Sequence, residues 1–477
     1  MFIEYGILHL TVLLFLWYFL GIAWTIVSLI VLFQMIGVIW GFFGLEYAVG
    51  QDIIHFFDSE KVIPNCVGYI EMKKIDGATL RDKNLYQKGI MNVRKLRQIP
   101  RNILGFFFWQ DVDSSHAIKQ FSTINTKFVD NNDVINYWNR WAHEKIPLSK
   151  PQWEMRLLED YSDETSLLFV KCHHSFTDGV GIVTLFAYLN DTSFCPKMIP
   201  QFKKITWLQK FMVALFVPYS LFHQYNVALF FKLKEQNKII HTPTNTNSGE
   251  SQFLCSKTYD FKDLQKWYKK YDKATFNNYV MGILGKSISD WYAKNGVHNP
   301  GDLVMTVPVN MKTLPERVED INMNNGTSTV TIHLPIVGDL KEAIYTSKER
   351  FAKYFKLPTL LAALNLQAFF SYVPPGIGRA FYKFFTKEID IVLSNVSGAR
   401  EAMYFCNREI LGITVFLGLF SDVGLNIVVN SYNMKVKVQI TADRKIQMDP
   451  EQLKDFIEAN LDEKILELSS EKTLVTN

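Results

Sequence analysis

Short apolar runs alternate with stretches of helical spacing through the first part of the chain. Compact apolar runs are typical of buried strands, and apolar residues three or four positions apart favour a helix that packs one face. The strands predicted in this way are residues 67–72, 153–158 and 167–170, and the helices are residues 132–144 and 182–186. Such a mixture predicts a mixed sheet flanked by helices.

The pattern resumes after a polar segment. Residues 241–251 are rich in Thr, Asn, Ser and Gly and predict a linker. Beyond it we predict strands at 303–309, 330–334, 389–393, 425–429 and 436–440, and helices at 262–271 and 278–294. Because 477 residues are too many for one simple core, we predict two α/β (α+β) halves, residues 46–200 and 252–477, joined through residues 201–251.

The N-terminal segment has a different pattern. No Asp, Glu, Lys or Arg occurs between Glu4 and Glu46, a span longer than the ~20 apolar residues of one membrane crossing. Residues 1–45 therefore predict one or two membrane helices, with the break at residues 21–25. A hairpin of two helices is favoured over one long helix, and a buried helix of a soluble core fits so long an uncharged run least well. The Lys and Arg that follow indicate a cytosolic catalytic part.

Two further apolar stretches lie in the second half of the chain. Residues 203–240 are flanked by lysines and predict either an interfacial helix on a membrane or a helix connecting the halves. Pro218 argues against a continuous spanning helix. Residues 357–385, broken at 374–376, are a second candidate for lipid contact.

Charge and cysteine content exclude several classes of function. The 51 basic and 47 acidic residues give a net charge of +4, which does not indicate a nucleic-acid partner. The five cysteines are scattered without a CxxC pair, so the sequence supports neither a zinc site nor a disulfide framework. The 37 Phe residues are compatible with a large core, an apolar ligand or a membrane surface.

The sequence HHSFTDG at residues 173–179 is the strongest chemical signal. It follows a predicted buried strand and precedes a turn into a helix. Adjacent strand side chains point to opposite faces, so His173 and His174 cannot both be ordinary packed core histidines. An imidazole at a strand end is suited to act as a general base. We interpret the neighbouring Cys172 as a structural residue.

These motifs together resemble one family. The chain resembles the bifunctional wax ester synthase/diacylglycerol acyltransferases, which are CoA-dependent acyltransferases related to chloramphenicol acetyltransferase. HHSFTDG matches the family's HHxxxDG, and the segment around Pro151 and Trp153 matches its Pro-Leu-Trp-Glu. Further matches in the same order are VPVN at 307–310, NNG at 324–326 with Leu334-Pro335, SNVSG at 394–398, and the segment 424–443.

Three features depart from the family pattern. Asn277-Asn278 stands where the family has Asn-Asp, and Ser397 replaces a proline. The apolar N-terminal segment is not a feature of bacterial members and resembles eukaryotic ones.

The resemblance implies two chloramphenicol-acetyltransferase-like halves around a central tunnel, with acyl-CoA entering from one side and the alcohol from the other. It implies that His174 is the general base and that no cofactor is needed, acyl-CoA being a co-substrate. His173 and Asp178 would support the loop, and Gly179 would form the turn. Asp178 would do so by pairing with an arginine, for which Arg400 is a guess.

Asn277, Ser394 and Asn395 are candidates for binding the developing oxyanion. The alternative for these residues is turn or cap chemistry. Residues 94–97 and Arg101 would meet CoA phosphates or lipid headgroups, unless they form an ordinary solvated basic face.

The expected function is acyl transfer from acyl-CoA to a long-chain alcohol or diacylglycerol at a bilayer, in the endoplasmic reticulum or at lipid droplets, with no metal. An inactive family member with a structural or interaction role is the alternative, supported by Asn278. A plant-type acyltransferase is a third interpretation. It is less favoured, because Asp422-Val423-Gly424-Leu425 only faintly resembles that group's second motif.

Overall fold

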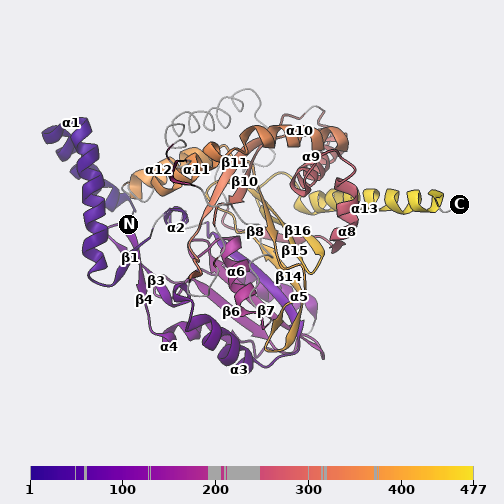
Figure 1. The fold of residues 1–477 in the computed structure, drawn as a ribbon, viewed down its shortest axis with the longest axis horizontal. Helices are drawn as coiled ribbons and strands as arrows, with labels where there is room; N and C mark the ends of the chain where they lie inside the picture. The colour runs from indigo at the N-terminus through magenta and orange to yellow at the C-terminus, as the bar shows by residue number, and fades with distance from the viewer. Residues whose placement is uncertain are drawn as a thin grey trace.

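A computed structural model places two large sheets side by side, each with its own helices (Figure 1). It describes residues 2–48, 50–57, 62–126, 128, 130–191, 206–208, 211, 248–298, 300–312, 315, 320–369, 373 and 375–475. Everything below refers to these residues.

The first sheet has six strands in the order β13-β14-β2-β7-β6-β5. Their bounds are β2 (Asn65–Lys73), β5 (Phe121–Thr123), β6 (Trp153–Leu158), β7 (Thr165–His173), β13 (Tyr404–Phe405) and β14 (Arg408–Phe416). The last two strands come from the C-terminal half of the chain. β14 pairs antiparallel with β2, so the first sheet is completed by a segment that follows most of the second sheet in sequence.

The contact between β14 and β2 depends on a glycine. A Cβ on Gly68 would lie 2.4 Å from the backbone oxygen of Thr414, so the two backbones approach closely where only glycine fits.

The second sheet has the strand order β11-β10-β12-β15-β16-β8, with β9 pairing with β16. Their bounds are β8 (Ser251–Cys255), β9 (Tyr259–Asp260), β10 (Leu303–Asn310), β11 (Thr327–Leu334), β12 (Ile391–Ser397), β15 (Leu425–Tyr432) and β16 (Lys435–Asp443). β12 is parallel to both β10 and β15, and the other pairs are antiparallel. The sheet is therefore mixed, as predicted.

Helices cover both sheets. In the first half they are α2 (Gln51–Ile54), α3 (Gly77–Thr79), the π-helix η1 (Leu80–Ile90), the 3-10 helices η2 (Arg94–Arg97) and η3 (Ile118–Gln120), α4 (Ser114–Ala117), α5 (Asn131–Ala142) and α6 (Gly179–Leu189). In the second they are α8 (Phe261–Tyr268), α9 (Phe276–Lys294), α10 (Leu340–Tyr354), α11 (Leu357–Phe369), α12 (Pro375–Thr386) and α13 (Pro450–Val475). The largest core joins α8, α9, α10 and α13 to the second sheet. A separate core joins α6 to the first sheet.

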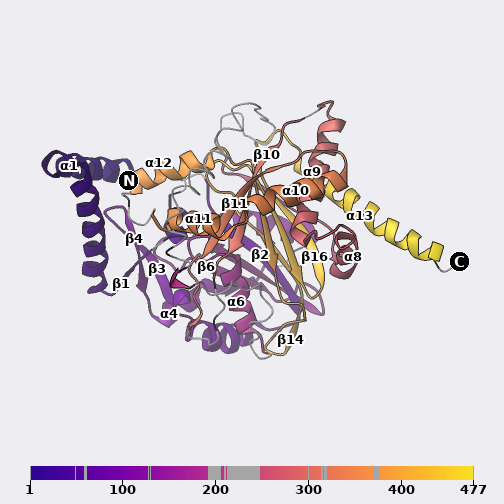
Figure 2. The same ribbon diagram turned by 45° about the horizontal axis from the view of Figure 1, so that its top comes forward.

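The N-terminal helix α1 (Phe2–Gly41) bends at Gly21, whose φ of 70° and ψ of 166° are not helical. This is within the predicted break, and Figure 2 shows the two parts running in different directions. The second part packs through Ile36 and Trp40 on a small sheet of β1 (Leu45–Tyr47), β4 (Phe106–Asp111) and β3 (Gln98–Ile103).

In the part of the chain that the structure describes, we find no helix of sufficient length and apolar character to cross a bilayer.

Most predicted elements are present in the described residues. The predicted strands at 67–72, 153–158, 167–170, 303–309, 330–334, 425–429 and 436–440 lie within observed strands, and 389–393 overlaps β12. In the apolar stretch 357–385, α11 ends at Phe369, before the predicted break at 374–376, and α12 begins within that break at Pro375. The predicted interfacial or connecting helix at 203–240 falls almost entirely outside the described residues.

Candidate active site

His174 lies directly after β7, beside a cavity of about 1070 Å³ between the two halves. Its backbone nitrogen donates to the Pro64 oxygen over 2.8 Å, which fixes the chain as it leaves the strand. Strands β2, β7, β10, β12 and β15 and helices α6, α11 and α12 all contribute to the lining. The cavity is therefore built from both halves, as the predicted tunnel requires.

The His174 ring contacts the second half of the chain. Its Nδ1 lies 3.1 Å from Oδ1 of Asn325. The Asn325 amide nitrogen in turn donates to the His174 backbone oxygen and to Oδ1 of Asp52, both over 2.8 Å. One asparagine thus holds the imidazole, the backbone behind it and a carboxylate together.

Asp52 forms a buried ion pair with Lys95. The Lys95 ammonium lies 2.9 Å from Asp52 Oδ2 and 2.9 Å from Asn324 Oδ1, and 3.6 Å from the centre of the Trp109 ring. Burial is the largest influence on the Lys95 pKa and lowers it. The prediction that Lys95 meets CoA phosphates or headgroups is wrong, because its charge is taken up inside the protein.

The other basic residues of that cluster lie nearer the surface. Arg94 pairs with Glu46 and Asp111, and Arg101 donates to Gln110. The role predicted for Arg94 and Arg101 in phosphate or headgroup binding stays a prediction.

His55 stacks on the His174 ring, with ring centres 3.9 Å apart. It follows α2 and also lines the cavity. Burial, and then the proximity of His174 and His173, lowers the pKa of His55 well below its ordinary value. A neutral ring therefore covers one face of His174.

His173 faces away from the cavity lining. Its Nδ1 lies 2.7 Å from the Ser175 hydroxyl, and its ring stacks on Phe56 at 5.3 Å. Burial, followed by the proximity of His174, lowers the pKa of His173 to about 3. These contacts fit the supporting role expected for His173.

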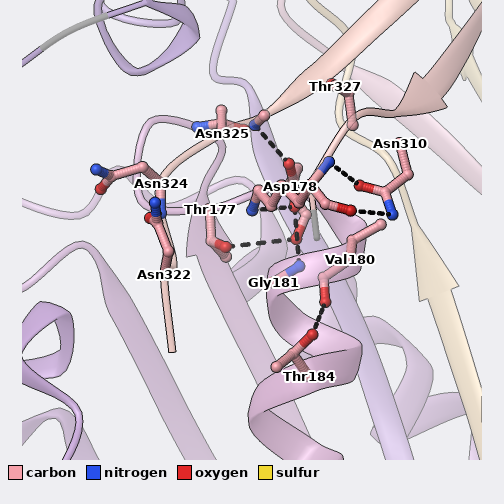
Figure 3. Close-up of polar contacts among 12 residues, drawn as sticks. Thr177, Asp178, Val180, Gly181, Thr184, Asn310, Asn322, Asn324, Asn325 and Thr327 are labelled. Carbon is pink, nitrogen blue, oxygen red and sulfur yellow. Dashed lines mark hydrogen bonds and ion pairs between the residues drawn. The ribbon is translucent and has the colours of Figure 1, made fainter. Parts of the chain in front are cut away.

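Asp178 joins the two halves and begins α6. Its Oδ1 accepts from the Gly181 nitrogen over 2.8 Å, which caps the helix. The same oxygen lies 2.9 Å from the Lys312 ammonium, and Oδ2 accepts from the Gly326 nitrogen over 2.8 Å. Figure 3 shows Asp178 below the strand ends of the second half that carry Asn310 and Thr327.

The predicted arginine partner of Asp178 is wrong. Among the described residues this carboxylate forms its ion pair with Lys312 and not with Arg400. The structural role predicted for Asp178 does fit this geometry, because the carboxylate is almost fully buried and satisfied by three donors.

The remaining motif residues divide into two groups. Gly179 lies in the cavity wall, where a Cβ would come within 3.3 Å of Val396 Cγ2. Trp153 is buried and donates from Nε1 to the Leu96 oxygen over 2.9 Å, and the Pro151 oxygen accepts from Gln120. Pro151 and Trp153 do not line the cavity and support the loop before β6.

The three oxyanion candidates all line the cavity. Asn395 donates from Nδ2 to Oδ1 of Asn277, so a residue of β12 and one of α9 form a pair of amides. Ser394 is next to this pair on β12.

Asn278 completes a capping box at the start of α9. Its side-chain oxygen accepts from the Thr275 backbone nitrogen and hydroxyl, while its own backbone nitrogen donates to the Thr275 hydroxyl oxygen. The residue at the family's Asp position therefore has a structural use.

Comparison with protein families supports the resemblance seen in the sequence. Residues 130–213 match the wax ester synthase/diacylglycerol acyltransferase catalytic domain, and residues 323–464 match the WS/DGAT C-terminal domain. The matches confirm the resemblance to this acyltransferase family in both halves of the chain. The acyltransferase is thus an enzyme that uses acyl-CoA as a substrate. Comparison with curated protein sequences gives no match.

Solved structures support the fold of the acyltransferase. The wax ester synthase/diacylglycerol acyltransferase from Marinobacter aquaeolei VT8 is 17% identical, with a TM-score of 0.58, and the match covers 88% of this chain and 99% of that one. The trichothecene 15-O-acetyltransferase from Fusarium sporotrichioides is 13% identical with a TM-score of 0.62, over 88% and 95% of the two chains. The starter condensation domain of rhizomide synthetase, solved with C8-CoA and Leu-SNAC, is 11% identical with a TM-score of 0.59, over 89% and 94%.

Three residues of the site are not predicted by the sequence. They are His55, which stacks on His174, Asn325, which contacts its Nδ1, and Asp52, which accepts from Asn325. The motif NNG at 324–326 is visible in the sequence, but nothing in one sequence places Asn325 beside a histidine 151 residues away. His55 and Asp52 lie between the predicted membrane segment and the first predicted strand, where no periodic pattern marks them.

Proposed function

We propose that the acyltransferase moves a fatty acyl group from acyl-CoA to the hydroxyl of a long-chain alcohol or of diacylglycerol, which gives a wax ester or a triacylglycerol. The observation that carries the proposal is a histidine of HHSFTDG beside a large cavity with mostly apolar walls. A cavity of this size and lining is suited to long apolar chains.

In the proposed reaction, His174 takes the proton of the acceptor hydroxyl. The hydroxyl oxygen attacks the thioester carbonyl carbon, and a tetrahedral intermediate forms. The carbon–sulfur bond then breaks, and the imidazolium returns the proton to the CoA thiolate. No acyl-enzyme is needed, because one base serves both steps.

The amide pair of Asn277 and Asn395 is the proposed source of oxyanion stabilisation. Both residues line the same cavity as His174. An amide N–H aimed at the developing negative charge lowers the barrier most where water is excluded.

Two lysines support the proposed position of CoA. Lys273 and Lys348 line the cavity near the start of α9 and on α10. Ammonium groups in the wall of a cavity are suited to the phosphates of CoA. The acyl chain would then run inward towards His174.

The acceptor is proposed to enter from the side of α11 and α12. Leu366, Tyr382 and Phe385 of these helices line the cavity, and α12 packs against α1. α1 exposes many large apolar side chains, including Phe15, Trp17, Phe19 and Trp24. Exposed apolar surface on this scale favours contact with lipid.

We propose on this basis that the enzyme works at a membrane of the endoplasmic reticulum or of lipid droplets, with its catalytic part on the cytosolic side. The test is binding of the full chain to phosphatidylcholine vesicles in a flotation assay. Replacing Phe15, Phe19 and Trp24 by serine should reduce the floated fraction, while the matched change Val297→Ser in an exposed loop should not. Equal flotation of both variants would argue against lipid contact through α1.

The activity is tested with membranes containing the full chain and radiolabelled palmitoyl-CoA. Hexadecanol and dioleoylglycerol are supplied separately, and the labelled lipid is separated by thin-layer chromatography. His174→Ala should reduce ester formation by about 1,000-fold, whereas His116→Ala, in an exposed histidine of α4, should leave it unchanged. The proposal fails if the wild-type enzyme makes no ester from either acceptor.

A further inference from the structure

Four polar groups form a continuous chain behind the cavity. The Lys95 ammonium contacts Oδ2 of Asp52, Oδ1 of Asp52 accepts from the Asn325 amide, and Oδ1 of Asn325 faces Nδ1 of His174. Lys95 and Asp52 come from the first half, and Asn325 comes from the second. No step of the proposed reaction uses the first three groups.

The two acceptors beside Nδ2 fix the orientation of the Asn325 amide. A carboxylate oxygen of Asp52 and the backbone oxygen of His174 each lie 2.8 Å from Nδ2, and neither can donate a hydrogen bond. The reverse orientation would place the amide oxygen against both of them. The amide nitrogen must therefore face these two groups, and Oδ1 must face the histidine.

This orientation in turn fixes the proton on His174. An amide oxygen can only accept, so the 3.1 Å contact requires that Nδ1 of His174 carry the hydrogen. In a neutral imidazole the second nitrogen, Nε2, then has the free lone pair. Nε2 is the atom that can accept a proton from a substrate.

We propose that Asp52 and Asn325 are positioning residues that hold His174 in the Nδ1–H tautomer and so make Nε2 the base. The role of Nε2 as the base rests on the proposed acyl transfer, but the tautomer is a property of the protein alone. Since Asn325 comes from the second half, the base has the right tautomer only when the two halves are assembled.

Asp52 is held for this role by its own contacts. The carboxylate is almost fully buried, and it also accepts from the backbone nitrogen of Asn325 over 2.9 Å. Lys95 neutralises its charge, and Trp109 covers the ammonium. The carboxylate therefore cannot turn away, because each oxygen has a fixed donor.

Other ionisable groups also surround His174 and would influence its titration. They are His55 after α2, His173 and Cys172 on β7, Cys66 on β2, and the Asp178–Lys312 pair at the start of α6. Among the described residues, the hydrogen bond to the His174 ring comes from Asn325 and not from these groups.

The first test compares Asn325→Leu with Asn132→Leu. Asn132 is exposed on α5, away from this network. Asn325→Leu should lower kcat by about 100-fold with little change in KM, because the base loses its tautomer and orientation. Asn132→Leu should retain wild-type values. A folded Asn325→Leu enzyme with wild-type kcat would overturn the proposal.

The second test exchanges the amide and the carboxylate in Asp52→Asn/Asn325→Asp. A carboxylate would then accept directly from Nδ1–H and raise the pKa of His174. Because the base works only when neutral, the acid limb of kcat/KM should move to higher pH, by about one unit. An unchanged limb would contradict the proposal, since a merely structural asparagine would not affect this profile.

A measurement independent of activity covers the case in which the exchange variant does not fold. In protein labelled with ¹⁵N-histidine, the resonances missing from His174→Gln identify His174. The wild-type spectrum should show a protonated Nδ1 and an unprotonated Nε2, and Asn325→Leu should show a mixture. An Nε2–H tautomer in the wild type would refute the proposal even if the enzyme makes ester. Loss of ester synthesis in the wild type would instead refute only the proposed function.

Discussion

At the scale of single residues, the contacts of the Asp178 carboxylate are structural. Its two oxygens accept from the Gly181 nitrogen, the Lys312 ammonium and the Gly326 nitrogen. The first contact orders α6, and the other two tie it to the second half. The acidic residue of HHSFTDG thus fixes the loop on which His174 is presented.

The variant Asp178→Asn tests this role. An amide has one accepting oxygen, so at least one donor loses its partner and Lys312 loses its counter-charge. The free energy of unfolding should fall by about 3 kcal/mol, measured from the urea midpoint. Adding Lys312→Met should restore part of the loss, because no unpaired ammonium then remains. Equal stability of Asp178→Asn and wild type would show that the ion pair is not needed.

The two histidines beside His174 predict a loss of stability in acid. Burial lowers the pKa of His55, and it lowers the pKa of His173 to about 3. An unfolded histidine titrates near 6.5. Between that pH and about 3, the unfolded chain binds a proton that folded His173 does not, so stability falls as the pH falls.

The expected slope is up to about 1.4 kcal/mol per pH unit for each such histidine. Urea unfolding at pH 7, 6 and 5 should therefore show a smaller pH dependence for His173→Gln than for the wild type. His116→Gln is the matched control at an exposed position. The same pH dependence in all three proteins would exclude this explanation.

At the scale of elements, the start of α9 explains a departure from the family pattern. Asn278 is buried and shares a capping box with Thr275. Its side chain accepts there, which a carboxylate can also do. The asparagine therefore gives no structural reason to expect an inactive enzyme.

Asn278→Asp tests this conclusion. The carboxylate can accept from the same two groups of Thr275, and a negative charge in the first turn interacts favourably with the helix dipole. The melting temperature should be unchanged or slightly raised, and ester synthesis should not fall. Thr275→Ala, which removes the cap, should cost about 1 kcal/mol. A large gain in activity for Asn278→Asp would show instead that the family's aspartate has a chemical role.

The sequence predicts local elements well because each has its own pattern. Apolar runs such as residues 303–309 and 436–440 are strands in any mixed sheet. The pairing of β14 with β2 has no such pattern, because more than 330 residues separate Ile413 from its partner Ile70. For the same reason the sequence motif predicts His174 and Asp178, whereas no local pattern predicts their partners Asn325 and Lys312.

At the scale of the whole molecule, the two predicted halves do not correspond to independent sheets. Strand β14 belongs to the first sheet, and Phe416 packs with Trp138 and Phe253 beside it. A cut in the predicted linker would leave β2 as an exposed edge. The domain boundaries remain a prediction from the sequence. The first sheet contains strands from both predicted halves.

A fragment of residues 46–240 should therefore not fold into a stable monomer. An open edge strand beside an uncovered aromatic cluster favours aggregation. Size-exclusion chromatography and amide exchange would show an aggregated or unprotected fragment. Co-expression with residues 241–477 should recover soluble protein, whereas a monomeric, protected 46–240 fragment would contradict this expectation.

The place of β14 in the first sheet also has a consequence for the order of events during synthesis. The partner strand β2 leaves the ribosome long before residue 416 is made. At the usual rate of translation, the interval between completion of β7 and completion of β14 is about 10–50 s. During that time the edge of β2 has no native neighbour. The nascent chain therefore needs protection by a chaperone, and codons that slow translation between residues 173 and 416 should lower the yield of active enzyme.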